Sequence, residues 1–270
     1  MVVLFTCSPA SFGQELLRAP SPAQAPQSSP VSENSFGWNQ FISEVSRQAL
    51  QFTEDLPNFI CTQTTRRYFN DTETGGWQLD DILEAELSFN ERKESYSKVR
   101  VNGRESPKRF ESLGGTLSVG EFGSILSALF SPEAQAVFRK EREEILRGKT
   151  VVVAAFSVPQ ASSQWTLSFK NTHSLKVGYH GWIWIDSATR QVLRITQRTE
   201  KLPAGFPIAY SETTTEYGSG LIRGVGSQEF LLPLNAELII QEVQPRRATR
   251  NLIAFRDFRR FTAEVKFRQN

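Results

Sequence analysis

The stretch 178–198, GYHGWIWIDSATRQVLRITQR, determines what kind of fold the rest of the chain can form. Two runs of β-favouring residues flank the turn-prone residues 186–189, so the stretch predicts an antiparallel hairpin. In the first run, Trp182 and Trp184 point to one face of the strand and the two isoleucines point to the other. Because both faces are apolar, we expect a helix on one side and either the core or a ligand on the other.

The composition limits the class of protein. A chain of 270 residues suits one large domain or two small ones, with ample length for a sizeable core. Its 20 phenylalanines and single methionine favour a rigid aromatic core over an adaptable surface. The net charge of +2 is too small for a general nucleic-acid binder.

The N-terminal residues predict export to the periplasm or secretion. An apolar run at Met1–Phe5 and the small residues after it are typical of a signal peptide, so residues 1–13 are interpreted as the remnant of one whose true start lies upstream. The alternative is a disordered tail of a cytosolic protein. Residues 14–35 are rich in Pro, Ser and Ala and predict a disordered linker. No apolar run reaches the length of about 18 residues that a membrane span needs.

The cysteines predict no disulfide bond in the mature chain. Cys7 would leave with the signal peptide, so Cys61 would remain alone. No base or second thiol lies near Cys61 in the sequence, so a small buried apolar side chain is a better interpretation of it than a nucleophile.

The remaining residues, 36–270, predict a single α+β domain. The apolar residues of Ser35–Leu56 follow helical spacing, and Pro57 ends the helix. A glycine-rich approach and a short amphipathic helix are predicted within 113–130, and a second short helix after Ser131. Residues 139–146 fit either an exposed helix or an edge strand. The other segments alternate as strands, and these are 58–70, 80–89, 94–101, 150–158, 164–169, 210–217, 228–231, 237–243 and 252–268.

Few residues in the sequence combine into a catalytic or metal-binding pattern. The histidines are His173 and His180, and no nucleophile motif of the G-x-S-x-G type accompanies them. The acidic pairs Asp80–Asp81 and Glu143–Glu144 are sequence neighbours, which point to opposite faces of a strand. No spacing of His, Cys and Asp suits zinc or calcium. The sequence therefore predicts neither an enzyme nor a bound metal or cofactor.

Basic residues concentrate near the C-terminus. They favour contact with an anionic membrane surface or an acidic envelope protein. The alternative is that they are solvated charges that protect edge strands from aggregation. The candidate surface patch consists of Arg246, Arg247, Arg250, Arg259 and Arg260.

The hairpin resembles a feature of the LolA/LolB periplasmic lipoprotein carriers and the related RseB-type lipid-sensor domains. The similarity rests on the strand 182–185, Asp186, Thr189 and the return strand 192–194 that ends with arginine. It implies a curved antiparallel sheet, or half-barrel, wrapped around an N-terminal helix and short inserted helices, with an apolar concavity for acyl chains. The candidate lining residues are Trp182, Trp184, Phe122, Ile125, Phe130 and Trp165, which a solid aromatic core would explain equally well.

The sequence also resembles uncharacterised secreted bacterial proteins with an LPNF-x-C-x-Q segment, here 56–63, and a GEFG segment, here 120–123. The predicted function is non-catalytic binding of a lipid, an acylated protein or another apolar ligand in a concave sheet. Phe122, Ile125 and Phe130 are expected to act as a lid on a glycine hinge. The alternative is a cell-envelope protein–protein interaction module with a solid core and a basic C-terminal surface.

Overall fold

The computed structural model describes residues 2–5, 33–71, 75–120, 122, 124–169, 173–244 and 246–261. Most of the predicted leader and linker, and the end of the predicted last strand, lie outside these residues. Val2–Phe5 form a short strand, β1. The division into a leader at 1–13, a linker at 14–35 and one domain at 36–270 stays a prediction.

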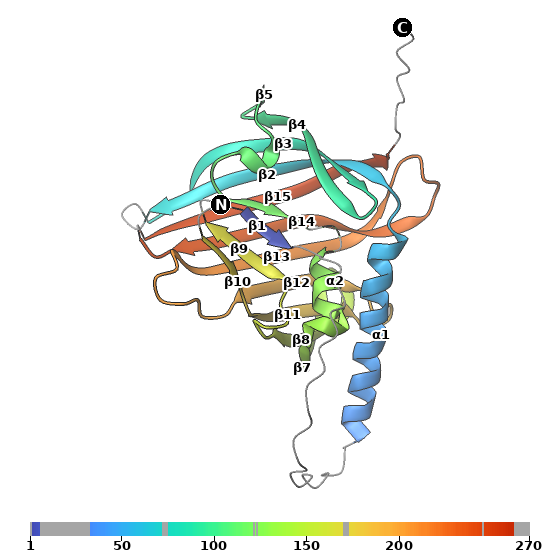
Figure 1. The fold of residues 1–270 in the computed structure, drawn as a ribbon. Helices are drawn as coiled ribbons and strands as arrows, with labels where there is room; N and C mark the ends of the chain where they lie inside the picture. Colours follow the sequence, from blue (N-terminus) through green and yellow to red (C-terminus); the bar gives the residue numbers. More distant parts are fainter. Residues whose placement is uncertain are drawn as a thin grey trace, which may run out of the picture.

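Most strands of the described chain belong to one large sheet of eleven, joined by antiparallel pairing throughout (Figure 1). Its order is β5-β4-β3-β2-β15-β14-β13-β12-β11-β8-β7. The bounds are β2 Phe59–Asp71, β3 Gln78–Asn90, β4 Lys93–Val101, β5 Arg104–Glu105, β7 Val137–Leu146, β8 Lys149–Val158, β11 Tyr179–Asp186, β12 Val192–Thr199, β13 Ile208–Leu221, β14 Glu229–Glu242 and β15 Arg247–Arg260.

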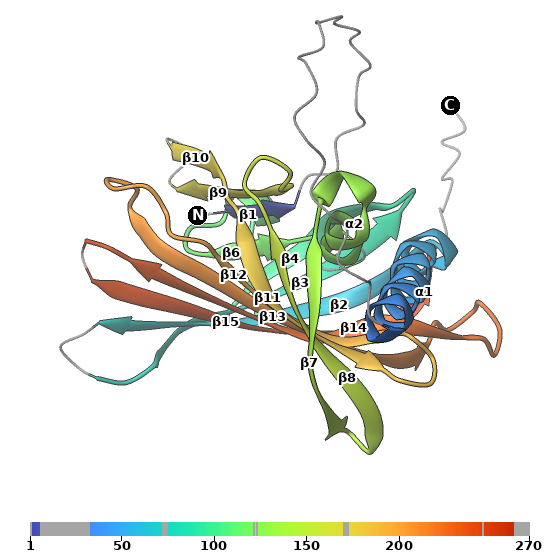
Figure 2. The ribbon, with the colours of Figure 1, turned by 90° about the horizontal axis from the view of Figure 1, so that it is seen from below.

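The large sheet is curved, and the other elements lie together on its concave side (Figure 2). We call these elements the cover. They comprise the helices α1 (Glu33–Asp55) and α2 (Ser124–Phe130), the short helices η1 (Phe110–Ser112) and η2 (Pro132–Ala134), and a second sheet of order β10-β9-β1-β6 formed by His173–Lys176, Trp165–Phe169, Val2–Phe5 and Leu117–Val119. The predicted α+β half-barrel, an open curved sheet around helices, is confirmed.

Helix α1 forms where helical spacing predicts it. Trp38, Phe41 and Ile42 pack against the main core while half exposed, and Val45 and Ala49 are buried. The helix begins at Glu33, two residues before the predicted start at Ser35, and ends before Pro57, which cannot continue it. The apolar side chains of α1 form a broad stripe along the helix, which runs across the direction of the strands (Figure 1).

The 178–198 hairpin is confirmed as β11 and β12, but its two faces differ. Ile183 and Ile185 are fully buried, and we call their side of the sheet the inner face. On the outer face, Trp184 is 9% exposed, against Val153 and Leu193, whereas Trp182 is 43% exposed. The expectation that both faces are covered is therefore wrong at Trp182.

Three other predictions are refined by the structure. Residues 139–146 belong to an edge strand, β7, and the helix expected after Ser131 is the single 3-10 turn η2. The strands expected at 228–231 and 237–243 are one continuous strand, β14. Pro233 interrupts the sequence pattern but is tolerated within β14, because β14 has a bulge beside it. Leu234 is the extra residue between the register pairs Glu216–Asn235 and Tyr217–Pro233.

Gly181 allows β11 and β12 to approach closely. A Cβ atom at this position would overlap the backbone carbonyl oxygen of Thr196. We expect Gly181→Ala to lower the free energy of unfolding by about 1–3 kcal/mol or more, since the backbone of β12 must shift. Urea unfolding measures this change. Gly76→Ala is the matched control, because a Cβ there meets nothing within 4 Å, and its effect should stay within about 0.5 kcal/mol. An equally small effect of Gly181→Ala would contradict the close approach.

Candidate functional site

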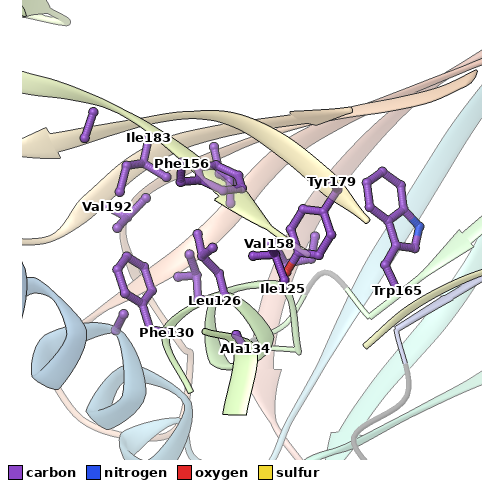
Figure 3. Close-up of a cluster of buried hydrophobic side chains, with 14 of the residues drawn as sticks. Ile125, Leu126, Phe130, Ala134, Phe156, Val158, Trp165, Tyr179, Ile183 and Val192 are labelled. Carbon is purple, nitrogen blue, oxygen red and sulfur yellow. The ribbon is translucent and has the colours of Figure 1, made fainter. Parts of the chain in front are cut away.

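The inner face carries an apolar region under α1 and α2. Side chains of Phe156, Ile183 and Val192, from three strands of the large sheet, point toward Leu126 and Phe130 of α2 (Figure 3). Five of the seven residues of α2 are buried: Ile125, Leu126, Ala128, Leu129 and Phe130. The helix therefore occupies the space that an apolar ligand would take against the sheet.

The structure divides the six predicted lining residues between the two faces of the sheet. Ile125, Phe130 and Trp165 belong to the apolar region of the inner face. Phe122 is buried in an adjoining cluster, with its ring 5.1 Å from that of Phe59. Trp182 and Trp184 are correctly assigned to a common face, but it is the outer one, so they do not line the concavity.

Helix α1 is tied to the hairpin turn by a residue that sequence analysis missed. Arg190 Nε donates to Glu44 Oε2 at 2.9 Å, and its guanidinium lies 4.7 Å from the ring centroid of Phe41. Closer to the N-terminus of the helix, Trp38 Nε1 donates to the carbonyl oxygen of Phe138 in β7 at 3.3 Å. Arg190 has a positive φ of 64°, a feature that the sequence around an arginine does not signal.

Asp186 builds the turn that presents Arg190. Its Oδ1 accepts hydrogen bonds from the backbone N–H groups of Ala188 at 2.9 Å and Thr189 at 3.2 Å, and its Oδ2 accepts one from Lys149 Nζ at 2.9 Å. Burial acts to raise the pKa of the Asp186 carboxyl, but these hydrogen bonds outweigh it and hold the pKa below its ordinary value. The aspartate of the predicted motif thus has a structural role.

The approach to α2 is held by a second carboxylate. Glu94 of β4 accepts hydrogen bonds from the backbone N–H groups of Gly120 and Phe122, both at 2.9 Å, and from the Tyr96 hydroxyl at 2.9 Å. Burial raises the pKa of the Glu94 carboxyl, although these hydrogen bonds act in the opposite direction. The segment predicted to be a free glycine hinge is therefore fastened, and its residues Glu121 and Gly123 lie outside the described part.

A small cavity lies where α1 meets the sheet. Its volume is about 130 Å³, and α1, α2, β14 and the residues before β12 and β14 line it. Its apolar walls come from Phe52, Leu56, Leu126, Val192 and Phe230. Binding pockets for organic ligands measure about 300–1,000 Å³, so this cavity is smaller than a pocket that could hold such a ligand.

Further along the inner face, the sheet changes from apolar to polar. Gln197, Thr213, Leu238, Asn251 and Arg67 are successive register partners across five neighbouring strands. We call them the cross-sheet row, and each is at most 7% exposed. Among the described residues, both amide atoms of Gln197 and the Oδ1 of Asn251 have no hydrogen-bond partner.

Buried polar atoms of this kind need an explanation, because each costs about 1–3 kcal/mol when it is left without a partner. The sequence shows these residues only as polar positions in alternating strands. Their common row depends on the register of four successive strand pairings, and one of these, between β15 and β2, joins segments more than a hundred residues apart, so no local signal reveals the row.

The predicted basic patch is not gathered in one place. Arg247 and Arg260 lie at opposite ends of β15, roughly 40 Å apart at strand spacing. Arg250 pairs with Glu237 and Arg259 with Glu86, each at 2.5 Å, so their charges are compensated. Arg246 and Arg260 are exposed.

In the described part of the chain, no three His, Cys, Asp or Glu side chains come together as a candidate metal site. Cys61 is buried, and burial raises the pKa of its thiol well above the ordinary value. No helix in the described ranges is both long and apolar enough to cross a membrane.

Comparison with solved structures finds similar chains over most of the length. A LolA superfamily protein from Nitrosomonas europaea is 11% identical, with 85% of this chain and 97% of that chain covered at a TM-score of 0.39. A domain of a putative outer membrane lipoprotein-sorting protein from Vibrio parahaemolyticus is 12% identical, with 83% and 93% covered at a TM-score of 0.35. The lipoprotein LppX from Mycobacterium tuberculosis is 9% identical, with 83% and 98% covered at a TM-score of 0.27.

These similar chains include a protein of the LolA superfamily, which the sequence also resembles. At such low identities and TM-scores, we argue nothing about function from them. No protein-family model and no curated protein matches the sequence.

The Asp186 turn yields a pH-dependent prediction. We expect Asp186→Ala to lower the free energy of unfolding at pH 7 by about 1.5–3 kcal/mol, because it removes charge-assisted hydrogen bonds. The depressed pKa means that the native carboxylate contributes stability above the ordinary aspartate pKa and loses it as the pH falls through its own, lower value. The difference between the two proteins should therefore shrink below about pH 4.

Denaturant unfolding at pH 7, 5, 4 and 3 measures this difference. Glu105→Gln, at an exposed position, is the control, and it should change stability by less than about 0.5 kcal/mol at pH 7. A difference between Asp186→Ala and the wild type that stays constant over the whole range would contradict the assignment.

Proposed function

We propose that this protein is a non-catalytic binding protein of the cell envelope, periplasmic or secreted, which takes up a lipid, an acylated protein or another apolar ligand against the inner face. One observation carries the proposal. The concave side of a continuous sheet is closed by separate pieces, and the helical pieces meet the sheet at a cavity whose lining is partly apolar and partly polar. A ligand can replace a cover that is not part of the sheet itself.

The closed cavity is too small for an acyl chain, so uptake requires part of the cover to move. Helix α1 is the candidate, because only Val45 and Ala49 among its described side chains are buried. The ion pair between Arg190 and Glu44 is about one-third exposed on both sides, and pairs of this kind contribute about 0–1 kcal/mol. Each methylene buried by the ligand would contribute about 0.8 kcal/mol in return.

The interaction-module alternative receives less support. It needs a common basic surface, whereas the arginines of β15 are spread along the strand and two of them are paired with glutamates. Non-catalytic binding is also consistent with the inner face, where the buried polar groups form a row across the sheet rather than a nucleophile with a base.

A cross-link between α1 and the hairpin turn tests the proposal. In a background with Cys7→Ser and Cys61→Ala, Glu44→Cys and Arg190→Cys are joined by a short bis-maleimide. The readout is the rate at which the delipidated protein takes up a fluorescent fatty acid. We expect uptake by the uncross-linked double variant, and uptake at least about tenfold slower after cross-linking, because α1 can no longer leave the inner face.

The two single-cysteine variants, treated with the same reagent, are the controls and should take up the probe at the uncross-linked rate. Absence of uptake by every form, the wild type included, would overturn the proposed function. Equal uptake before and after cross-linking would overturn the role of α1.

A further inference from the structure

A polar pocket lies where β2 and β14 finish and β15 begins. This end of the large sheet can be followed in Figure 1. Its volume is about 420 Å³, within the range of ligand pockets. It is separate from the small cavity under α1 and has no residue in common with that cavity. The residues that matter for its chemistry are Phe69, Asp80, Glu242, Arg247 and Asn251.

Arg247 supplies a positive charge that forms no ion pair in the described part of the chain, although Asp71 is its register partner on β2. Its guanidinium stacks on Phe69, 4.5 Å from the ring centroid, and its Nε is buried with no hydrogen-bond acceptor. Arg250, on the same strand, has a glutamate partner at 2.5 Å. A buried guanidinium N–H without an acceptor is unfavourable, and an anion in the pocket would complete its hydrogen bonds.

Asn251 supplies an acceptor to the same pocket. Its Nδ2 donates to the carbonyl oxygen of Thr116 at 2.9 Å, which fixes the orientation of the amide. The Oδ1 atom is then left without a donor, although the side chain is only 1% exposed. This buried oxygen needs an N–H or O–H donor, which a ligand in the pocket can supply.

Two carboxylates decide between the kinds of ligand that would satisfy both groups. Glu242 is on the inner face of β14, close to the start of β15, and Asp80 lines the pocket from β3. Neither forms an ion pair with a residue of the described ranges. They would repel a plain dianion, and they would attract an ammonium group beside the anionic group that Arg247 binds.

We propose that this pocket binds a zwitterionic head group, in which a phosphate and a primary ammonium are a few ångströms apart. The phosphate pairs with Arg247, and the ammonium donates to Asn251 Oδ1 and is attracted by Glu242 and Asp80. The assignment rests on the proposed function in one respect: the cross-sheet row connects the pocket to the inner face, so that a lipid could place its head group here and its chains under the cover. Gln197 and Asn251 of that row are about 14 Å apart, three strand spacings.

The experiment compares three probes by titration calorimetry on delipidated protein. They are dihexanoyl phosphatidylethanolamine, dihexanoyl phosphatidylglycerol with the same chains, and soluble O-phosphoethanolamine. We expect the ethanolamine lipid to bind at least about tenfold more tightly than the glycerol lipid. Arg247→Gln should weaken binding of the ethanolamine lipid about tenfold or more, and Glu242→Gln should reduce the preference over the glycerol lipid.

Arg246→Gln is the matched control, because it removes the same charge from an exposed neighbour outside the pocket, and it should leave both affinities unchanged. Thermal unfolding of all variants checks that they are folded, and Glu242→Gln keeps the test valid if the loss of stacking on Phe69 unfolds Arg247→Gln.

Two outcomes support the assignment of a head-group site and distinguish it from the proposed uptake of an apolar ligand against the inner face. Binding of soluble phosphoethanolamine that is as tight as that of the lipid, with the same dependence on Arg247, identifies a free head group as the ligand, even if the protein takes up no fatty acid. Lipid binding that is much tighter than that of the soluble head group identifies a lipid. Equal affinity for both lipids, or an Arg247→Gln variant that binds like Arg246→Gln, would overturn the assignment.

Discussion

The apolar inner face of the eleven-stranded sheet must be shielded from water. The arrangement of the helices and of the second sheet follows from this requirement. At about 25 cal/mol per Å² of apolar surface, exposure of the side chains around Ile183 and Ile185 would be strongly destabilising. A closed barrel would bury them by contact with the opposite strands. Here the sheet stays open, and its concave side is covered by two helices and a small second sheet. The cover packs on the sheet through apolar side chains and is thus necessary for stability, but hydrogen bonds hold it only at particular points.

Those points are polar and local, whereas the sheet is continuous. The Asp186 turn holds Arg190 against α1, and Glu94 holds the approach to α2. A cover built in this way can separate from the sheet at a smaller free-energy cost than the sheet can unfold. Beneath it, the inner face passes from isoleucine and phenylalanine to glutamine, asparagine and arginine. This gradient suits an amphipathic ligand better than a purely apolar one.

The sequence predicts much of the fold because its local signals are strong. Helical periodicity places α1 within two residues, and the WIWI run with its turn predicts the β11–β12 hairpin correctly. The same run could not show which side is inside, because tryptophan and isoleucine are both apolar and alternate without a polar face. The orientation is decided by α2, whose Leu126 and Phe130 pack on the isoleucine side.

The candidate site was less predictable, for a related reason. Its tie to α1 uses an arginine with a positive φ, and its polar pocket joins Thr116 to Asn251, which are 135 residues apart. Such features arise from strand pairing and not from local pattern. Pro233 has the opposite effect, since a residue that usually ends a strand is accommodated by a bulge in its own strand.

The central claim is that α1 is a separable part of the cover. Native-state hydrogen exchange, followed by mass spectrometry of peptides from 33–55 and from β11 to β13, tests it most directly. The account predicts that in the ligand-free protein the amides of α1 exchange through an opening of lower free energy than those of the three strands. Exchange of α1 and the strands at one common free energy would show that they open only together, and would contradict it.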